Sequence, residues 1–159
     1  MLATSSQYEF TQRFRVPARE AYDWCTDYRE DDLSLMGEKG HRGIQRLTED
    51  TLILSEIVHT GKKTVKKRKL IKLNPTELRW YNIQLEGSFK HSTFLYHIQP
   101  EGPKASRLTF TGLIVVYSRR RLSASKIRAI ASTERQYDAR AWTLLAKEME
   151  RDLATQNRD

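Results

Sequence analysis

Two carboxylates near the C-terminus have the spacing of groups that could transfer protons. Glu134 and Asp138 are four residues apart in a stretch, from Ser123 onward, that contains no Gly or Pro. At 100° per residue, both fall within the apolar stripe of one predicted helix. A carboxylate directed into a core needs a cationic partner or a bound proton, and a carboxyl group with a raised pKa can act as acid or base on a carbonyl compound. The alternative is that both are solvated.

Basic residues on a predicted strand could supply the opposite charge. In the segment KKTVKKRKLIKL, Lys67 and Lys69 share one strand parity, and Lys66 and Arg68 share the other. Successive side chains of a strand point to opposite faces, so either register places cations on the concave side of a curved sheet. We therefore expect a partly polar cavity, with the register left open.

Aromatic residues could line that cavity or simply fill a core. Phe94 and Tyr96 share the strand parity that we expect to face inward, whereas His91 and His97 share the outward parity. Gly112, in the middle of a predicted strand, indicates a bulge or a close approach of the backbone to the long helix or a ligand. The complete set of candidate ligand-binding residues is Trp80, Phe94, Tyr96, Phe110, Gly112, Glu134, Asp138 and Trp142.

Other chemistry has little support in the sequence. No HExxH or CxxC motif suggests a metal site, the acidic stretch DYREDD lacks the ligand pattern of a calcium loop, and no GxSxG elbow is present. Cys25 lies on the apolar face of a predicted helix and is expected to be a small buried hydrophobe. We expect no metal and no cofactor.

The strongly basic composition makes an anionic partner plausible. The formal charge is +8, and basic residues cluster at Lys66, Lys67, Arg68 and Lys69 and again at Arg119, Arg120 and Arg121. These residues could form a surface for an anionic membrane or, less favoured, for nucleic acid, or they could be solvated charges that prevent edge-to-edge aggregation. The oligomeric state is left open.

Size and cysteine usage limit the architecture and compartment. A chain of 159 residues without a Pro/Gly/Ser-rich linker is expected to form one domain, 1–159. The single cysteine excludes an intramolecular disulfide. No segment has the pattern of a signal peptide or membrane span, so we expect a cytoplasmic protein.

The hydrophobic pattern predicts an α+β protein in a definite order. Residues 8–16 alternate as a strand, and Pro17 opens a helix that runs to about Asp27, followed by a second short helix near Leu33. Short turns then separate predicted antiparallel strands at 43–48, 51–59, 63–73, 77–85, 89–99 and 107–117. One long helix follows from Ser123 to the C-terminus.

This order resembles the helix-grip fold of the Bet v 1/START-like superfamily, also called SRPBCC. The resemblance is carried by FRVPAREAYDWCTD at the start and by LEGSFKHSTFLYHIQPEG with SRLTFTGLIVVY before the last helix. It implies a seven-stranded curved antiparallel sheet wrapped around a long C-terminal helix, with two short helices between the first and second strands. It also implies a cavity between sheet and helix; superfamily members include lipid and hormone carriers, polyketide cyclases and chaperone-regulating domains.

Three functions are compatible with these features. The first is a carrier or sensor that encloses a hydrophobic or amphipathic, lipid-like small molecule. The second is an enzyme of the cyclase or dehydratase kind that uses Glu134 or Asp138 as acid or base. The third is a module whose basic surface binds RNA, an anionic membrane or a protein.

Overall fold

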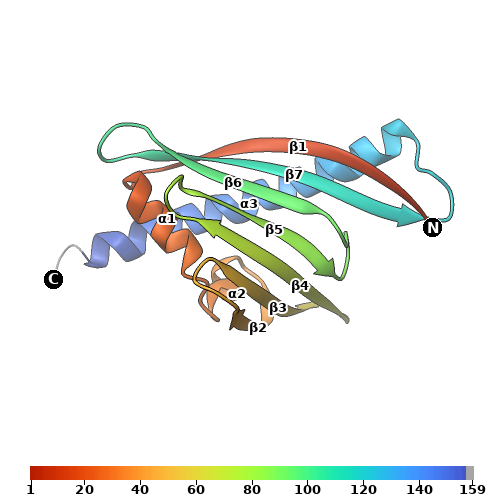
Figure 1. Cartoon of the computed structure of the whole chain (residues 1–159), viewed down its shortest axis with the longest axis horizontal. Coiled ribbons are helices and arrows are strands. Elements are labelled where there is room, and N and C mark those ends of the chain that lie inside the picture. The colour runs from red at the N-terminus through yellow and green to blue at the C-terminus, as the bar shows by residue number, and fades with distance from the viewer. Residues whose placement is uncertain (157–159) are drawn as a thin grey trace.

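The computed structural model describes residues 1–156 and contains one antiparallel sheet and three helices (Figure 1). The strands are β1 Leu2–Phe14, β2 Lys39–Arg46, β3 Thr51–Thr60, β4 Lys63–Asn74, β5 Arg79–Glu86, β6 Thr93–Pro100 and β7 Ser106–Ser118. The helices are α1 Ala18–Thr26, α2 Asp32–Leu35 and α3 Ala124–Gln156. The predicted helix-grip order is confirmed.

The sheet has the strand order β1-β7-β6-β5-β4-β3-β2, and every neighbouring pair is antiparallel. The first strand, β1, therefore pairs with the last strand, β7. Short turns join each of the strands from β2 to β6 to the next one in sequence. In Figure 1, α3 runs behind the strands, and α1 and α2 lie toward its C-terminal half. This arrangement gives the sheet a concave face toward α3 and a convex face on the other side.

Helix α3 contains 33 residues, so it is about 50 Å long. Its buried residues recur at helical spacing and are Ile127, Ala131, Ala141, Leu145, Ala146 and Met149. The last three residues of the predicted helix lie outside the described part of the chain. In residues 1–156, no helix combines the length and apolar character needed to cross a membrane.

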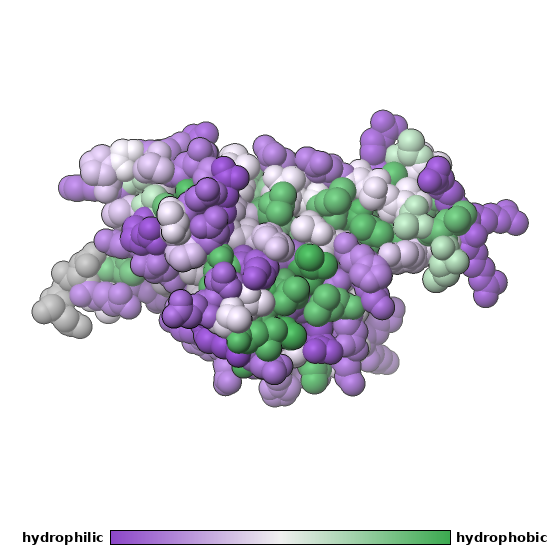
Figure 2. Space-filling model, viewed as in Figure 1, coloured by the Kyte–Doolittle hydropathy of each residue, from purple (hydrophilic) through white to green (hydrophobic). Residues whose placement is uncertain are grey.

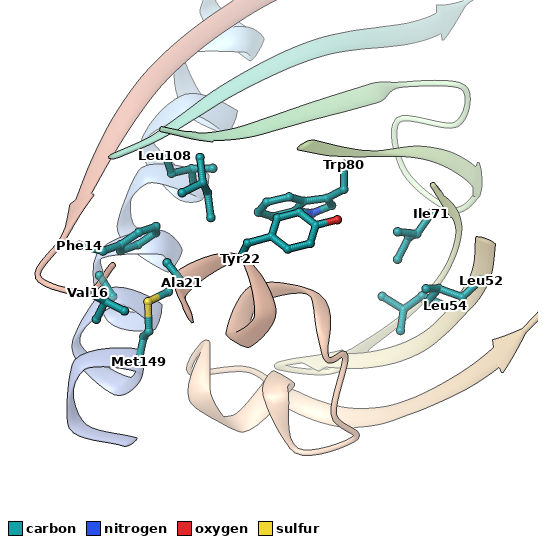
Figure 3. Close-up of a cluster of buried hydrophobic side chains, with 12 residues drawn as sticks. Phe14, Val16, Ala21, Tyr22, Leu52, Leu54, Ile71, Trp80, Leu108 and Met149 are labelled. Atoms are coloured by element: carbon teal, nitrogen blue, oxygen red, sulfur yellow. The ribbon is translucent and has the colours of Figure 1, made fainter. Parts of the chain in front are cut away.

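The main core joins α1, the sheet and the C-terminal half of α3 (Figure 3). Phe14, Val16, Ala21 and Met149 lie together on one side of the close-up, where Phe14 and Met149 have no exposed surface. Ile71 and the β3 leucines lie on the opposite side, with Tyr22 and Trp80 between them. A second cluster, which includes Tyr8, Phe10 and Phe110, packs under the N-terminal half of α3.

Several predicted boundaries were wrong. The first strand was predicted to begin at Tyr8, but β1 begins at Leu2, because the polar segment 2–7 pairs with the end of β7. Strand β2 begins at Lys39, ahead of the predicted Gly43. Strand β6 begins at Thr93 because Phe89 and His91 adopt positive φ angles of 59° and 70° in the preceding turn, which ends the extended backbone.

Candidate functional site

A cavity of about 140 Å³ lies between the concave face of the sheet and α3. An aromatic cage forms one side of it. Trp80 and Tyr96 stack with centroids 4.6 Å apart and an interplanar angle of 4°, while Phe110 meets Tyr96 edge-on at 5.0 Å. Trp142 of α3 lies 5.9 Å from the Tyr96 ring and completes the cage. The rings come from three neighbouring strands and the helix, so the cavity depends on the closed sheet–helix arrangement.

Asp138 is the carboxylate that lines this cavity, and the Tyr8 hydroxyl donates a hydrogen bond to its Oδ2 atom. Burial raises the pKa of Asp138; the hydrogen bond from Tyr8 and the charges of Lys69 and Lys67 oppose that rise only in part. Burial and the adjacent carboxylate also raise the pKa of Tyr8, which keeps its hydroxyl protonated as a donor. Tyr8 and Asp138, called here the Tyr8–Asp138 dyad, therefore place a proton-binding carboxyl group beside the aromatic cage.

Glu134 lies one turn before Asp138 but does not line the cavity. Burial is the main cause that raises its pKa, the charge of Asp138 adds to the rise, and Lys67 lowers it. Two carboxylates on one helix face disfavour each other's ionisation. The charge of Asp138 thus adds to the raised pKa of Glu134, whereas Asp138 itself is the carboxylate that a molecule in the cavity can contact.

The strand register places Lys67 and Lys69 on the concave face and Lys66 and Arg68 on the convex face. This resolves the alternative that the sequence left open. It also corrects the predicted basic surface, because Lys67 and Lys69 are partly buried and point toward the acidic residues of the interior. Arg119, Arg120 and Arg121 are exposed in the connection between β7 and α3.

A buried ion network extends the polar side of the cavity. Arg42 of β2 donates from Nη1 to Asp32 Oδ2 at 2.8 Å, and its Nη2 atom lies 3.7 Å from Glu56 Oε1. Lys69 Nζ lies 3.7 Å from the same Glu56 oxygen. Arg42 and Glu56 have side chains only 6% and 4% exposed. The two contacts of 3.7 Å bring opposite charges together but are too long to be hydrogen bonds.

Three buried polar atoms in the described residues around this region have no hydrogen-bond partner: Arg42 Nε, Glu56 Oε1 and Asn82 Oδ1. Asn82 is 3% exposed, and its amide nitrogen donates to the Tyr96 hydroxyl at 3.0 Å. Arg42 and Asn82 both line the cavity. Because unsatisfied buried polar atoms are costly, one donor and one acceptor here favour a polar molecule with complementary groups.

The end of α1 and the segment that joins it to β2 line the cavity with Trp24 of α1 and with Tyr28 and Met36 of the segment. Both are tied to α3 through Asp152, which accepts from Trp24 Nε1 at 3.0 Å and from Arg29 Nη2 at 3.3 Å. Cys25 also lines the cavity, and burial raises the pKa of its thiol, which disfavours the nucleophilic thiolate.

Gly112 has a role that differs from the predicted bulge. The register runs without a shift through the facing residues Tyr8, Gly112 and Phe94. A Cβ atom added to Gly112 would lie 2.7 Å from Tyr8 Cε1. The close approach is therefore that of the Tyr8 ring, which crosses the space above the glycine toward Asp138.

The structure brings most of the predicted residues together. Six of the eight candidate ligand-binding residues line the cavity, namely Trp80, Phe94, Tyr96, Phe110, Asp138 and Trp142. The prediction omitted Tyr8, Arg42 and Asn82. Tyr8 shares strand parity with the buried Phe10, and Asn82 shares it with the buried Trp80. The alternation of the strands alone could therefore have predicted that both residues point inward. In residues 1–156, no group of three His, Cys, Asp or Glu side chains could hold a metal ion.

Comparison with known proteins reveals similarity in structure alone. No family model matches the sequence, and no curated protein matches it. The Zhui aromatase/cyclase from Streptomyces sp. R1128 superposes with a TM-score of 0.79 at 13% identity, over 94% of this chain and 96% of that one. A START superfamily protein from Mycobacterium smegmatis gives 0.70 at 16% identity, over 91% and 97%.

A third solved structure is norcoclaurine synthase from Thalictrum flavum, in complex with dopamine and hydroxybenzaldehyde. Its TM-score is 0.64 at 11% identity, over 90% of this chain and 88% of that one. All three share the curved antiparallel sheet that grips a C-terminal helix across nearly the whole length of this chain. The chain therefore has the helix-grip fold of the Bet v 1/START-like and polyketide cyclase-like proteins.

Proposed function

We propose that this protein binds a hydrophobic or amphipathic small molecule that carries a ring and at least one polar oxygen, in the cavity between the sheet and α3. The observation that carries the proposal is the convergence of the aromatic cage with Asp138, Arg42 and Asn82 on one cavity. Ligand sites typically combine an apolar lining with a few convergent polar groups.

The cavity volume narrows the ligand class. A dry cavity of about 150 Å³ holds one benzene-sized ring, and the cavity here measures about 140 Å³. A ring of this size would stack within the cage of Trp80, Tyr96 and Trp142. An extended lipid chain exceeds this volume, so compact aromatic compounds fit the cavity best.

The test of binding uses a variant that fills the cavity. Ala141 of α3 lines the cavity and is 8% exposed, so Ala141→Phe would place a ring inside it. Ala129→Phe, on an exposed position of the same helix, is the matched control. Native mass spectrometry of gently purified protein, followed by titration of Trp fluorescence with 4-hydroxybenzaldehyde, should show binding to wild type and the control but not to Ala141→Phe. Equal binding by all three proteins would contradict the proposal.

The Tyr8–Asp138 dyad supports a second candidate, an enzyme of the cyclase or dehydratase kind. In its protonated form, the Asp138 carboxyl group can donate a proton to a carbonyl or hydroxyl oxygen of the bound molecule, and the ionised form can take a proton back. The structural neighbours include an aromatase/cyclase and a synthase, which makes acid–base chemistry in this fold a reasonable expectation.

Asp138→Asn separates the two candidates. The amide keeps an oxygen that accepts from Tyr8, so ligand binding should persist while any proton-transfer turnover is lost. Glu134→Gln should retain turnover, because Glu134 does not line the cavity. Turnover that survives Asp138→Asn would exclude Asp138 as the acid or base. Ligand binding by wild type without any turnover would leave the carrier or sensor role.

A further inference from the structure

The convex face of the sheet carries an apolar row that no element of the described chain covers. The strand register aligns Ile53 with Leu70, Leu70 with Ile83, Ile83 with Thr93, and Thr93 with Leu113. The row therefore crosses five strands at right angles to them, and Thr93 is its one polar member. With about 4.8 Å between strands, it is about 19 Å long.

Exposed side chains beside this row widen it into an apolar surface. Leu95 is 48% exposed, and Tyr81, which faces it across β5 and β6, is 38% exposed; Leu113, at the end of the row, is 42% exposed. Figure 2 shows hydrophobic side chains gathered over the middle strands of this face, with hydrophilic ones around them. A contiguous exposed apolar surface of this kind is typical of an interaction site.

A groove of about 360 Å³ lies next to the row on β2, β3 and β4. Its floor is low because the facing residues Gly43 and Ser55 have the smallest side chains there, and nothing lies within 4 Å of a Cβ atom added to Gly43. Ile57 borders the groove on one side. Lys66 and Arg68 stand at its β4 end and are exposed.

The charge at this groove indicates an acidic occupant. In the described residues, neither Lys66 nor Arg68 makes an ion pair, in contrast to Lys72 at the far end of β4, which lies 3.6 Å from Asp50. Two acidic residues border the groove. Glu86 faces Arg68 across the bulge between β4 and β5, and the buried Glu56 is already paired with Arg42 and Lys69, so the exposed charge at the groove stays predominantly positive. A second copy of this chain would bring like charges together, which opposes self-association on this face.

We propose that the convex face binds an acidic amphipathic helix of a partner protein, with its apolar residues on the Ile53–Leu113 row and its carboxylates on Lys66 and Arg68. The 5.4 Å pitch of a helix is close to the strand spacing, so a helix lying across the strands presents about one apolar side chain to each strand. All residues of the row except Leu113 are only partly exposed, so little of the row could insert into a lipid layer, which favours a protein over a lipid surface.

The test is an NMR titration of the full-length, ¹⁵N-labelled protein with a synthetic amphipathic helix of Leu and Glu. A peptide of the same pattern with Lys in place of Glu is the control. The Glu peptide should shift amide signals of β2 to β7 on the convex face, and the Lys peptide should not. No shifts at millimolar Glu peptide, or shifts confined to other surfaces, would overturn the proposal.

Charge-matched variants locate the site. The double variant K66E/R68E should weaken binding of the Glu peptide roughly tenfold or more at low salt, whereas R119E/R120E, with the same change in charge, should not. Leu95→Ser should weaken it without loss of the folded NMR spectrum. Equal weakening by the two double variants would show non-specific attraction and reject the site.

Binding to phosphatidylserine vesicles without peptide binding would reject the helix and identify a membrane as the partner. Ala141→Phe should leave peptide binding unchanged, which separates this surface from the cavity.

Discussion

The contact between α3 and the rest of the molecule is dense near its C-terminal end and hollow in its middle. At the dense end, Met149 and Phe14 are completely buried in one apolar cluster. Two turns earlier, Ala141 and Trp142 border a cavity. Asp138 also lines it and accepts a hydrogen bond from Tyr8, which lies near the N-terminus in β1. One helix therefore serves two tasks. Its end packs into the core, and its middle borders a cavity and places the carboxylate of Asp138 there.

The largest effect is expected at the dense end. Phe14→Ala should lower the free energy of unfolding by about 3–5 kcal/mol, because it removes a fully buried ring and leaves a void. Urea denaturation followed by circular dichroism measures the change. Phe14→Leu is the control and should cost less. If Phe14→Ala costs no more than a surface substitution, the dense end is not the stabilising part of the contact.

Gly112→Val should have the next largest effect, on both stability and the dyad. The added side chain collides with the Tyr8 ring, and overpacking of this kind costs about 1–3 kcal/mol. We expect the hydrogen bond from Tyr8 to Asp138 to break and ligand binding to weaken. Gly43→Val, which meets nothing within 4 Å, is the control for stability. In a Tyr8→Ala background the penalty of Gly112→Val should shrink; a penalty that is unchanged there would exclude the collision with Tyr8.

Asp138→Asn tests whether the buried carboxylate at the cavity lowers the free energy of unfolding at neutral pH. Because the pKa of Asp138 is raised in the fold, the folded state binds more protons than the unfolded state between the ordinary Asp pKa and the raised one. Wild-type stability therefore decreases as pH rises through that window. The variant lacks this loss, so it should be more stable than wild type at neutral pH and similar at pH values below the ordinary Asp pKa. Unfolding curves that differ equally at all pH values would contradict the raised pKa.

The smallest effect on stability is expected on the convex face. Leu113→Ser changes a side chain that is 42% exposed and lies outside both buried clusters. Its free energy of unfolding should stay within about 0.5 kcal/mol of wild type. A loss as large as that of Phe14→Ala would show that the apolar row is part of the core rather than a docking surface.

Local patterns were sufficient for the order of the elements and for much of the site. Alternation placed Phe94 and Tyr96 on the inward parity, and helical spacing placed Asp138 inside the stripe of α3. These predictions succeeded because the periods of a strand and a helix are properties of the backbone alone. The strand limits near Phe89 and Leu2 failed, since they depend on a strained turn and on pairing with a distant strand.

The amino-acid sequence was enough to specify seven strands, three helices, and a strand β4 with cations on both faces. Only the tertiary structure decided that Lys69 faces inward, that Tyr8 reaches Asp138 across 130 residues of sequence, and that Gly112 leaves room for that contact. The physical reason is that these features arise when β1 closes against β7 and α3 crosses the sheet. Whether the enclosed space is filled or hollow depends on the combined volume of side chains from every element around it.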